Sequence, residues 1–236
     1  MSYHVRFEDL GVRDYKETWD YQESLLDALR SNKLAASASS AGNNGEAMPH
    51  LLFVEHPHVY TLGKSGSENN LLINYMQLQA HEASFYHIDR GGDITYHGPG
   101  QLVGYPIFDL DLLGIGLRQY IGRLEQAIAD TLEEYGLHGA AVEGATGVWL
   151  DTGPGLSPRK ICAIGVKVSR GVTMHGFAFN INTDLEYFSH INPCGYTDRG
   201  VTSLQKELGK TLSVEEVKGV VREKLANRFN LKYSER

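Results

Sequence analysis

The stretch from residue 159 to residue 180 constrains the fold of this chain most strongly, because it predicts a β-hairpin. Two runs rich in apolar and β-branched residues flank the pair Arg170-Gly171, and two such runs around a short turn are typical of paired antiparallel strands. If the loop consists of those two residues, Ser169 lies opposite Val172. Arg-Gly is less common in two-residue turns than Asn-Gly, so a three-residue loop is the alternative.

The two loop lengths make different predictions for the small residues of the hairpin. A two-residue loop pairs Gly165 with Gly176 and Ala163 with Ala178, which gathers four small residues on one face of the sheet. A three-residue loop sets Gly165 against His175 and scatters them, so we favour the shorter loop. The patch then leaves room for a thin apolar ligand or for a closely packed helix. The opposite face is predicted to be core and carries Ile164, Val166, Phe177 and Phe179.

The two cysteines of the chain differ in their surroundings. So small a number argues against a disulfide scaffold and favours a reducing compartment. Cys162 has the parity of Ile164 and Val166 in the hairpin, so we expect it to be buried and inert. Cys194 lies between a proline and a glycine, in a turn that can hold a thiol at a surface cleft. Cys194 is therefore the candidate nucleophile for acyl thioesters, with an inert buried thiol as the alternative.

The remaining elements predict an α+β fold. Apolar periodicity indicates helices at residues 14–30 and 117–135, and strands are expected at 5–10 and 51–54. Two capping-box patterns predict further helices near the C-terminus, at Thr202 with Gln205 and at Ser213 with Glu216. Strands and helices occur in blocks and do not alternate strictly, which favours a mixed, largely antiparallel sheet packed with helices.

Length and composition indicate one soluble domain. The 236 residues suit a single catalytic domain over 1–236, with a flexible low-complexity insertion near 35–48. The net charge of −7 argues against a general nucleic-acid binder. No apolar run approaches the roughly 18 residues needed to cross a bilayer, and the first residues lack the apolar core of a signal peptide. We expect a cytoplasmic protein that binds no nucleic acid and no membrane.

A glycine-rich segment, residues 90–101, is the second candidate for a ligand site. Its glycines allow close backbone approach and leave N–H groups free to donate, although a pair of hairpin turns would look the same. The segment matches neither phosphate-loop pattern. His97 within it could carry a proton or serve a structural role. His56 and His58 have no third ligand at a recognisable spacing, so we predict no metal site.

A cation near Cys194 would lower the pKa of its thiol and populate the thiolate. Lys160 and Lys167 are the candidates within the hairpin. Lys160 follows a loop with two prolines and has more freedom to reach a cleft. Strict alternation along the strand points Lys160 away from the small-residue face, so its use requires a β-bulge or a frayed strand end.

Four motifs together resemble the octanoyltransferases of lipoate biosynthesis. They are residues 90–106, 159–165, 175–178 and 192–195. In this chain the resemblance extends from about Leu51 to Leu204. The fold that it implies is shared with biotin-protein and lipoate-protein ligases, and the expected state is a monomer. Such enzymes transfer an octanoyl group from octanoyl-acyl carrier protein to a lysine of lipoyl domains. These domains belong to 2-oxoacid dehydrogenase complexes and to the glycine cleavage H protein.

The resemblance also assigns roles to residues. Cys194 matches the acyl-accepting nucleophile, and Lys160 matches the lysine that lowers the thiol pKa and later handles the amine proton. No cofactor is implied, because exchange between thioesters is close to isoenergetic. The segments that match the binding site for the acyl chain and thioester carbonyl consist of Arg90, Gly91, Gly92, Asp93, Ile94, Thr95, Tyr96, His97, Ala163, Ile164, Gly165, Gly176, Phe177 and Ala178.

Three other functions remain open at this point. An ATP-dependent lipoate or biotin ligase would share the fold but would need more basic residues around its glycine-rich loop. A thioesterase would use Cys194 but release the acyl group to water. A non-enzymatic module that binds acyl carriers would keep its function after Cys194→Ala, whereas a transferase would lose acyl transfer.

Overall fold

The computed structural model describes residues 2–38, 47–192 and 200–234. Within them, one mixed sheet forms the centre of the molecule, with its strands in the order β12-β1-β2-β6-β10-β9-β8-β7, and β11 pairs with β9. The strands of this sheet are β1 (Tyr3–Val12), β2 (His50–Glu55), β6 (Gln101–Ile107), β7 (Ala140–Val142), β8 (Ala145–Leu150), β9 (Arg159–Ser169), β10 (Val172–Asn180), β11 (Gly200–Val201) and β12 (Leu231–Ser234). Most of the pairs are antiparallel, as predicted.

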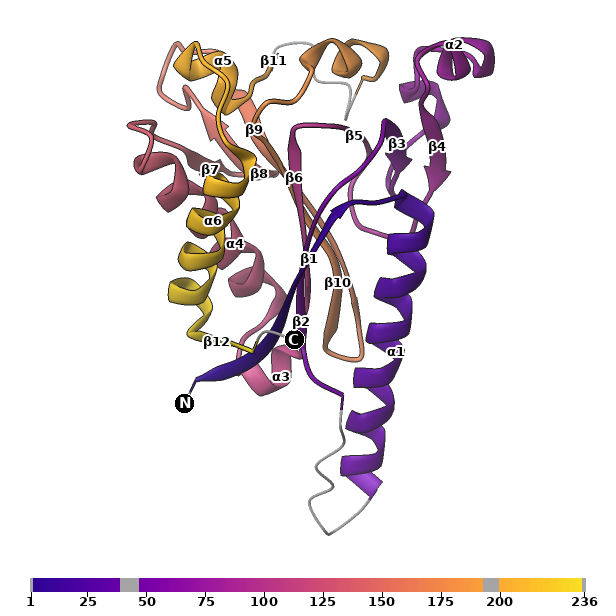
Figure 1. Cartoon of the computed structure of the whole chain (residues 1–236), viewed down its shortest axis with the longest axis vertical. Helices are drawn as coiled ribbons and strands as arrows, with labels where there is room; N and C mark the ends of the chain where they lie inside the picture. The colour runs from indigo at the N-terminus through magenta and orange to yellow at the C-terminus, as the bar shows by residue number, and fades with distance from the viewer. Residues whose placement is uncertain (1, 39–46, 193–199, 235–236) are drawn as a thin grey trace.

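Helices cover both faces of the central sheet (Figure 1). Helix α1 (Tyr15–Ala38) packs on one face, while α4 (Leu117–Glu133) and α6 (Val214–Phe229) pack together on the other. Leu124, Ile128 and Leu132 of α4 are fully buried, which confirms the predicted helical period. The core therefore consists of two layers, one on each side of β2, β6 and β10.

Helix α1 is eight residues longer than the sequence predicts. The prediction ended the helix at residue 30, but it continues to Ala38, because alanines 35, 36 and 38 favour helix more than any other residue type. The first four residues of the expected insertion at 35–48 are therefore helical. Residues 39–46 of that insertion lie outside the described residues.

The predicted register of the hairpin is confirmed. Ser169 pairs with Val172, Gly165 with Gly176 and Ala163 with Ala178. Arg170 and Gly171 both adopt positive φ, at 52° and 81°, as a two-residue turn of the type that matches strand twist requires. The turn is therefore tight although its sequence is not the commonest one.

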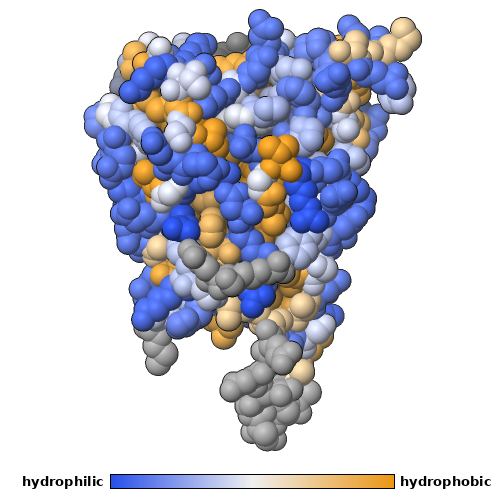
Figure 2. All heavy atoms as spheres, viewed as in Figure 1, coloured by the Kyte–Doolittle hydropathy of each residue, from blue (hydrophilic) through white to orange (hydrophobic). Residues whose placement is uncertain are grey.

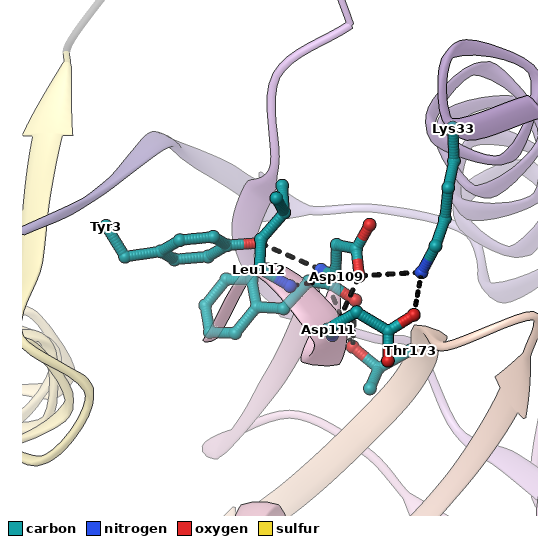
Figure 3. A network of polar contacts seen from close by, with 7 residues as sticks. Tyr3, Lys33, Asp109, Asp111, Leu112 and Thr173 are labelled. Carbon is teal, nitrogen blue, oxygen red and sulfur yellow. Dashed lines mark hydrogen bonds and ion pairs between the residues drawn. The ribbon is translucent and has the colours of Figure 1, made fainter. Parts of the chain in front are cut away.

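The tip of the hairpin is tied to the rest of the molecule by a polar network (Figure 3). Lys33 of α1 reaches two carboxylates at the short helix α3 (Leu110–Leu113), Asp109 at 2.9 Å and Asp111. The backbone N–H of Asp109 donates to the Tyr3 hydroxyl at 2.8 Å. Thr173 receives the Phe108 N–H at 2.9 Å. Thr173 lies next to the turn, so the last bond attaches the closed end of the hairpin to the segment before α3, while the Lys33 and Tyr3 contacts attach that segment to α1 and β1.

A smaller sheet stands beside the open end of the hairpin (Figure 1). Its strands have the order β4-β3-β5, and they are β3 (Val59–Leu62), β4 (Ser84–His87) and β5 (Ile94–His97). Helix α2 (Tyr75–Ala80) and the 3₁₀ turns η1 (Glu68–Asn70) and η2 (Leu185–His190) complete this lobe. Because β5 continues through a turn into β6, the lobe is held directly against the central sheet.

One helix start differs from the prediction by a single residue. Helix α5 (Leu204–Leu208) is capped by Ser203, whose side chain accepts from the Lys206 N–H, and not by Thr202. The Thr202 hydroxyl instead donates to Glu207. The predicted cap Ser213 of α6 is confirmed. The error at Thr202 arose because adjacent Thr and Ser are both good caps.

The surface combines hydrophilic and apolar groups. Figure 2 shows one face that is mostly hydrophilic, with apolar groups between the helices. No helix among the described residues is both long and apolar enough to cross a bilayer.

Candidate active site

A cavity of about 480 Å³ opens beside β9 and β10, a volume within the usual range for small-ligand pockets. Its walls come from the β9–β10 hairpin, from the glycine-rich segment that leads into β5, and from β8. Lys160 lines it, as do all but one of the predicted substrate-binding residues, namely Arg90, Gly91, Gly92, Asp93, Ile94, Thr95, His97, Ala163, Ile164, Gly165, Gly176, Phe177 and Ala178. Segments far apart in the sequence thus meet at one site.

Tyr96 is the exception, because its side chain does not line the cavity. It is fully buried in the apolar cluster of the smaller lobe. Its hydroxyl pairs with His58 Nδ1 at 2.7 Å, and its ring stacks on that of Tyr187. Its neighbours Thr95 and His97 line the cavity, whereas the Tyr96 ring packs against Tyr60 and Phe188 of the smaller lobe.

Lys160 reaches the cavity through a β-bulge. Val148 pairs with Cys162, but the next residue, Trp149, pairs with Lys160. Ile161 is therefore an extra residue in β9, and both Ile161 and Cys162 point into the core. The bulge reverses the side-chain parity. Lys160 thus shares the cavity with Ala163, which resolves the conflict with strict alternation.

Cys162 is buried, as predicted. Its side chain has no exposed surface, and burial raises the pKa of its thiol far above the ordinary value. A thiol of this kind is protonated at neutral pH and cannot act as a nucleophile.

Cys194 lies outside the described residues, but the residues that flank this gap, Asn192 and 200–202, are hydrogen-bonded to other parts of the fold. On one side, the Asn192 N–H donates to Asn70 O at 2.8 Å. On the other side, β11 runs parallel to the start of β9, so that Val201 pairs with Lys160. The Thr202 N–H donates to Lys160 O at 2.9 Å. Residues 200–202 are thus bonded to the strand segment that carries Lys160.

Arg159 strengthens the same junction. Its guanidinium contacts Asp151 at 2.5 Å and also binds Glu207 of α5. Glu207 accepts the Thr202 hydroxyl as well. A planar guanidinium with two carboxylate partners holds a fixed orientation. Arg159 therefore fixes the start of β9 relative to α5 and the residues that follow β11.

The floor of small residues has two parts. Ala163 and Ala178 line the cavity with their methyl groups. A Cβ at Gly165 would lie 3.0 Å from Gly91 O, and one at Gly176 would lie 2.1 Å from Gly104 O. These two glycines allow the backbone of the glycine-rich segment and of β6 to approach closely, so this part of the patch packs against neighbouring backbone and not against a helix.

Arg90 closes one side of the cavity and is largely buried. Its guanidinium donates to Thr61 O at 2.8 Å and to Thr61 Oγ1 at 3.0 Å. The Gly91 N–H donates to Val166 O at 3.0 Å. The glycine-rich segment is therefore fastened to the hairpin across Gly165.

His97 is fixed and electrically neutral. Its Nδ1 donates to Gln101 Oε1 at 2.9 Å, and its ring stacks on Tyr15. Burial, with the nearby His56, lowers the pKa of His97 to about 3. Such a group is a very weak base, so these contacts favour the structural alternative for His97 over a proton carrier.

A polar group that includes Asp89, a residue the sequence did not single out, lies beside the cavity, which its member His175 lines. His175 Nε2 pairs with Asp89 Oδ1 at 3.0 Å, and Lys167 binds the other oxygen of Asp89. His175 has a φ of +59°, which is uncommon for a residue with a side chain. Lys167 is thus paired with Asp89 and does not line the cavity, whereas Lys160 does.

Other lining residues were also missed, among them Tyr15, Tyr105, Trp149 and Asn180. They come from α1, β6, β8 and the end of β10. Each belongs to an element with a clear structural pattern of its own, so the sequence contains no separate signal for its place at the cavity.

Comparisons with known proteins identify the family of the chain. The profile of the lipoyl protein ligase A/B catalytic domain matches residues 14–226. An octanoyltransferase of Christiangramia forsetii is 52% identical over 230 residues, which cover 97% of this chain and 95% of that protein. An octanoyltransferase of Flavobacterium johnsoniae is 51% identical over 235 residues, covering 97% and 98% of the two chains.

Solved structures show the same fold at low sequence identity. A bipartite lipoate protein ligase from Thermoplasma acidophilum is 15% identical with a TM-score of 0.66, covering 99% of this chain and 87% of that one. A biotin protein ligase from Aquifex aeolicus is 14% identical with a TM-score of 0.52, covering 95% and 70%. The predicted relation to both ligase folds is thus confirmed. The chain belongs to the octanoyltransferases, acyltransferases of the lipoate pathway built on the lipoyl protein ligase A/B catalytic domain.

Proposed function

We propose that this enzyme transfers an octanoyl group from octanoyl-acyl carrier protein to a lysine of lipoyl domains, through a thioester on Cys194. The observation that carries the proposal is the pairing of Val201 with Lys160. It brings the chain that leads away from Cys194 alongside the one cationic residue that the bulge turns into the cavity. A thiol and an ammonium at the mouth of an apolar pocket suit acyl transfer.

In the first half-reaction, the Cys194 thiolate attacks the carbonyl carbon of the octanoyl thioester. A new C–S bond forms to Cys194, the C–S bond to the donor breaks, and the donor leaves as a thiol with a proton from the Lys160 ammonium. Lys160 lines the cavity. Backbone N–H groups of the glycine-rich segment would stabilise the oxyanion of the tetrahedral intermediate.

In the second half-reaction, the neutral amine of the acceptor lysine attacks the Cys194 thioester. The C–N bond forms, the C–S bond breaks, and the amine proton passes to Lys160, which restores the thiolate and ammonium. His97 is a poor alternative base, because its Nδ1 already donates to Gln101 and the pKa of its ring is lowered to about 3. Lys160 therefore has both proton-transfer roles.

The lining of the cavity suits the binding of an apolar acyl tail. Ala163, Ala178 and Val103 contribute apolar surface along it. Burial contributes about 0.8 kcal/mol for each CH₂ group, so a tail of eight carbons gains several kcal/mol. That gain suffices to select a medium-length chain over a short one.

The partners follow from this reaction. The donor is the acyl carrier protein, and the acceptors are lipoyl domains of 2-oxoacid dehydrogenase complexes and the glycine cleavage H protein. We propose that the enzyme acts as a cytoplasmic monomer. Its similarity in fold to a bipartite lipoate protein ligase that was analysed along with its E2 lipoyl domain is consistent with this class of acceptor.

Intact mass spectrometry after mixing with octanoyl-loaded carrier protein tests the proposal. The expected result is an adduct of octanoyl mass that peptide mapping localises to Cys194, and that disappears when a lipoyl domain is added. Wild-type enzyme without an adduct, or an adduct that persists in Cys194→Ala, would contradict the thioester mechanism.

Two variants serve as controls. Cys162→Ala removes the buried thiol and should keep the adduct, because Cys162 has no exposed surface. Lys160→Met keeps most of the length of the side chain without its charge and should slow adduct formation at neutral pH by at least tenfold. An unchanged rate in Lys160→Met would remove Lys160 from the mechanism.

A further inference from the structure

Strand β10 has an irregular backbone at His175. Its pairing with β6 runs from Asn180 to Phe177, and His175, two residues before Phe177, has a φ of +59°. The His175 backbone N–H donates to Gln22 Oε1 of α1 at 3.0 Å. A positive φ costs free energy in a residue with a side chain. The fold therefore maintains an orientation of this histidine that strand pairing alone does not explain.

The imidazole of His175 presents a hydrogen-bond acceptor without a partner. The residue is 2% exposed and lines the cavity. Its Nε2 pairs with Asp89 Oδ1 at 3.0 Å, and this hydrogen bond holds the pKa of Asp89 well below its usual range. The carboxylate can only accept, so Nε2 carries the hydrogen. Burial lowers the pKa of His175 and keeps the ring neutral. Its Nδ1 is therefore an acceptor, and no described residue donates to it.

Gln22 presents a donor that also lacks a partner. Its side chain is fully buried. Because the His175 backbone N–H can only donate, the amide atom that faces it is Oε1, which identifies the other as Nε2. Within the described part of the chain, Nε2 has no hydrogen-bond partner. The Tyr105 hydroxyl is near, since Gln22 lowers its pKa against the larger effect of burial, but it forms no hydrogen bond with Nε2.

The two atoms without partners belong to groups that are already in contact through the bond from the His175 N–H to Gln22 Oε1. Buried polar atoms in folded proteins nearly always have a partner, either protein or water. A hydroxyl group suits both atoms at once, since its oxygen accepts from Gln22 Nε2 and its hydrogen is donated to His175 Nδ1. A carbonyl group could satisfy Gln22 alone, and a methyl group satisfies neither atom.

The register of the hairpin places this pair beyond the small residues of the floor. Ala163 pairs with Ala178, and Val166 pairs with His175. Along β9, Ala163 is three residues from Lys160, whereas Val166 is six residues away, or roughly 20 Å. An acyl tail that begins near Lys160 therefore passes Ala163 and Ala178 first, and only a longer tail approaches His175.

We infer that His175 and Gln22 form a subsite for one hydroxyl group in the cavity wall, filled by water beside an octanoyl tail and by the terminal hydroxyl of a longer ω-hydroxyacyl tail. The role of the subsite in catalysis rests on the proposed function. A longer tail that ends in a methyl group displaces the water and leaves both polar atoms unpaired, which is unfavourable in a buried site. The subsite thus limits the length of a purely apolar tail.

Binding of free fatty acids tests the subsite without any acyl transfer. Calorimetry with the wild-type enzyme would compare plain acids with their ω-hydroxy analogues over a series of lengths from octanoate upward. In the shorter acids the hydroxyl meets the apolar floor, so the ω-hydroxy acid should bind more weakly than the plain acid. At the length that reaches His175, it should bind at least tenfold more tightly, because two hydrogen bonds replace two unpaired polar atoms. Tighter binding of the plain acid at every length would overturn the inference.

Matched variants on α1 connect the preference to Gln22. Gln22→Met keeps a similar side-chain size without the donor and should reduce the preference for the hydroxyl to below about threefold at the optimal length. Ser24→Met introduces the same side chain at an exposed position of α1 and should keep the full preference. A full preference in folded Gln22→Met would contradict the assignment. If Gln22→Met does not fold, the length series in the wild-type enzyme still decides.

Crystal structures distinguish the two sources of the hydroxyl group. With octanoate bound, we expect an ordered water between His175 Nδ1 and Gln22 Nε2. With the optimal ω-hydroxy acid bound, we expect the hydroxyl of the ligand in the same place. An octanoate complex that shows other buried waters but none at this position would argue against the subsite.

Adduct formation with the same tails on carrier protein separates the subsite from the proposed function. If the ω-hydroxy acids show the binding preference but no tail forms an adduct on Cys194, the thioester mechanism fails and the subsite stands. If octanoyl adducts form but the hydroxyl is disfavoured at every length, the subsite fails and the thioester mechanism stands.

Discussion

Replacement of Ala163 by leucine tests whether the hairpin floor holds the acyl tail. Ala163 follows Lys160 by three residues on β9, roughly 10 Å along the strand, and its methyl group faces the cavity. Leucine adds three carbon atoms at this point. The side chain would occupy space that about three methylenes of an octanoyl tail use.

The size of the effect follows from the lost burial. Three methylenes at about 0.8 kcal/mol each contribute about 2.4 kcal/mol, which corresponds to a reduction of roughly 60-fold in kcat/KM. A butanoyl tail, being four carbons shorter, ends before Ala163 and should be affected little. The ratio of octanoyl to butanoyl activity should therefore fall by about the same factor.

The assay is adduct formation under single-turnover conditions with octanoyl-loaded and butanoyl-loaded carrier protein. Val168→Leu, on the same strand but exposed to solvent at its far end, is the matched control and should leave the ratio unchanged. An equal loss with both donors in Ala163→Leu would show that the substitution disturbs the reacting groups and not the tail. An unchanged ratio would place the tail elsewhere.

Two further predictions concern stability. Gly147→Ala places a Cβ on a backbone with a φ of +120° and against Cys162 O. It should lower the free energy of unfolding by about 2 kcal/mol and Tm by about 4–8 °C. The control Gly122→Ala on α4, where a Cβ meets no atom within 4 Å, should not lower Tm. Burial lowers the pKa of His56 to about 4 and of His97 to about 3, so the unfolded chain binds more protons than the folded chain between those values and about 6.5. The free energy of unfolding should reach its full value above about pH 6.5 and should fall as the pH drops, by roughly 2 kcal/mol per histidine at pH 5. Denaturant unfolding of wild type and His97→Gln at pH 7.5 and pH 5 should show a smaller pH dependence in the variant. An equal pH dependence in the two proteins would contradict this assignment.

Local patterns along the chain predicted much of the fold. The hairpin register followed from a two-residue turn, which the sequence favoured over a three-residue loop because it pairs the small residues with one another. The period of α4 followed from apolar spacing alone. The glycine-rich segment and the hairpin were recognised as parts of one site because their motifs occur together in a known family.

The tertiary structure decided what counting residues cannot. Whether Lys160 faces the cavity depends on one extra residue in β9, and a bulge is set by the partner strand β8. Tyr96 was predicted to bind substrate because it lies within the glycine-rich motif. Its side chain instead packs in the apolar cluster of the smaller lobe. Gln22 belongs to no motif, and only the packing of α1 against β10 brings it to His175. Sequence patterns report interactions between near neighbours in the chain, whereas the charge and shape around Lys160 arise from elements that meet only after folding.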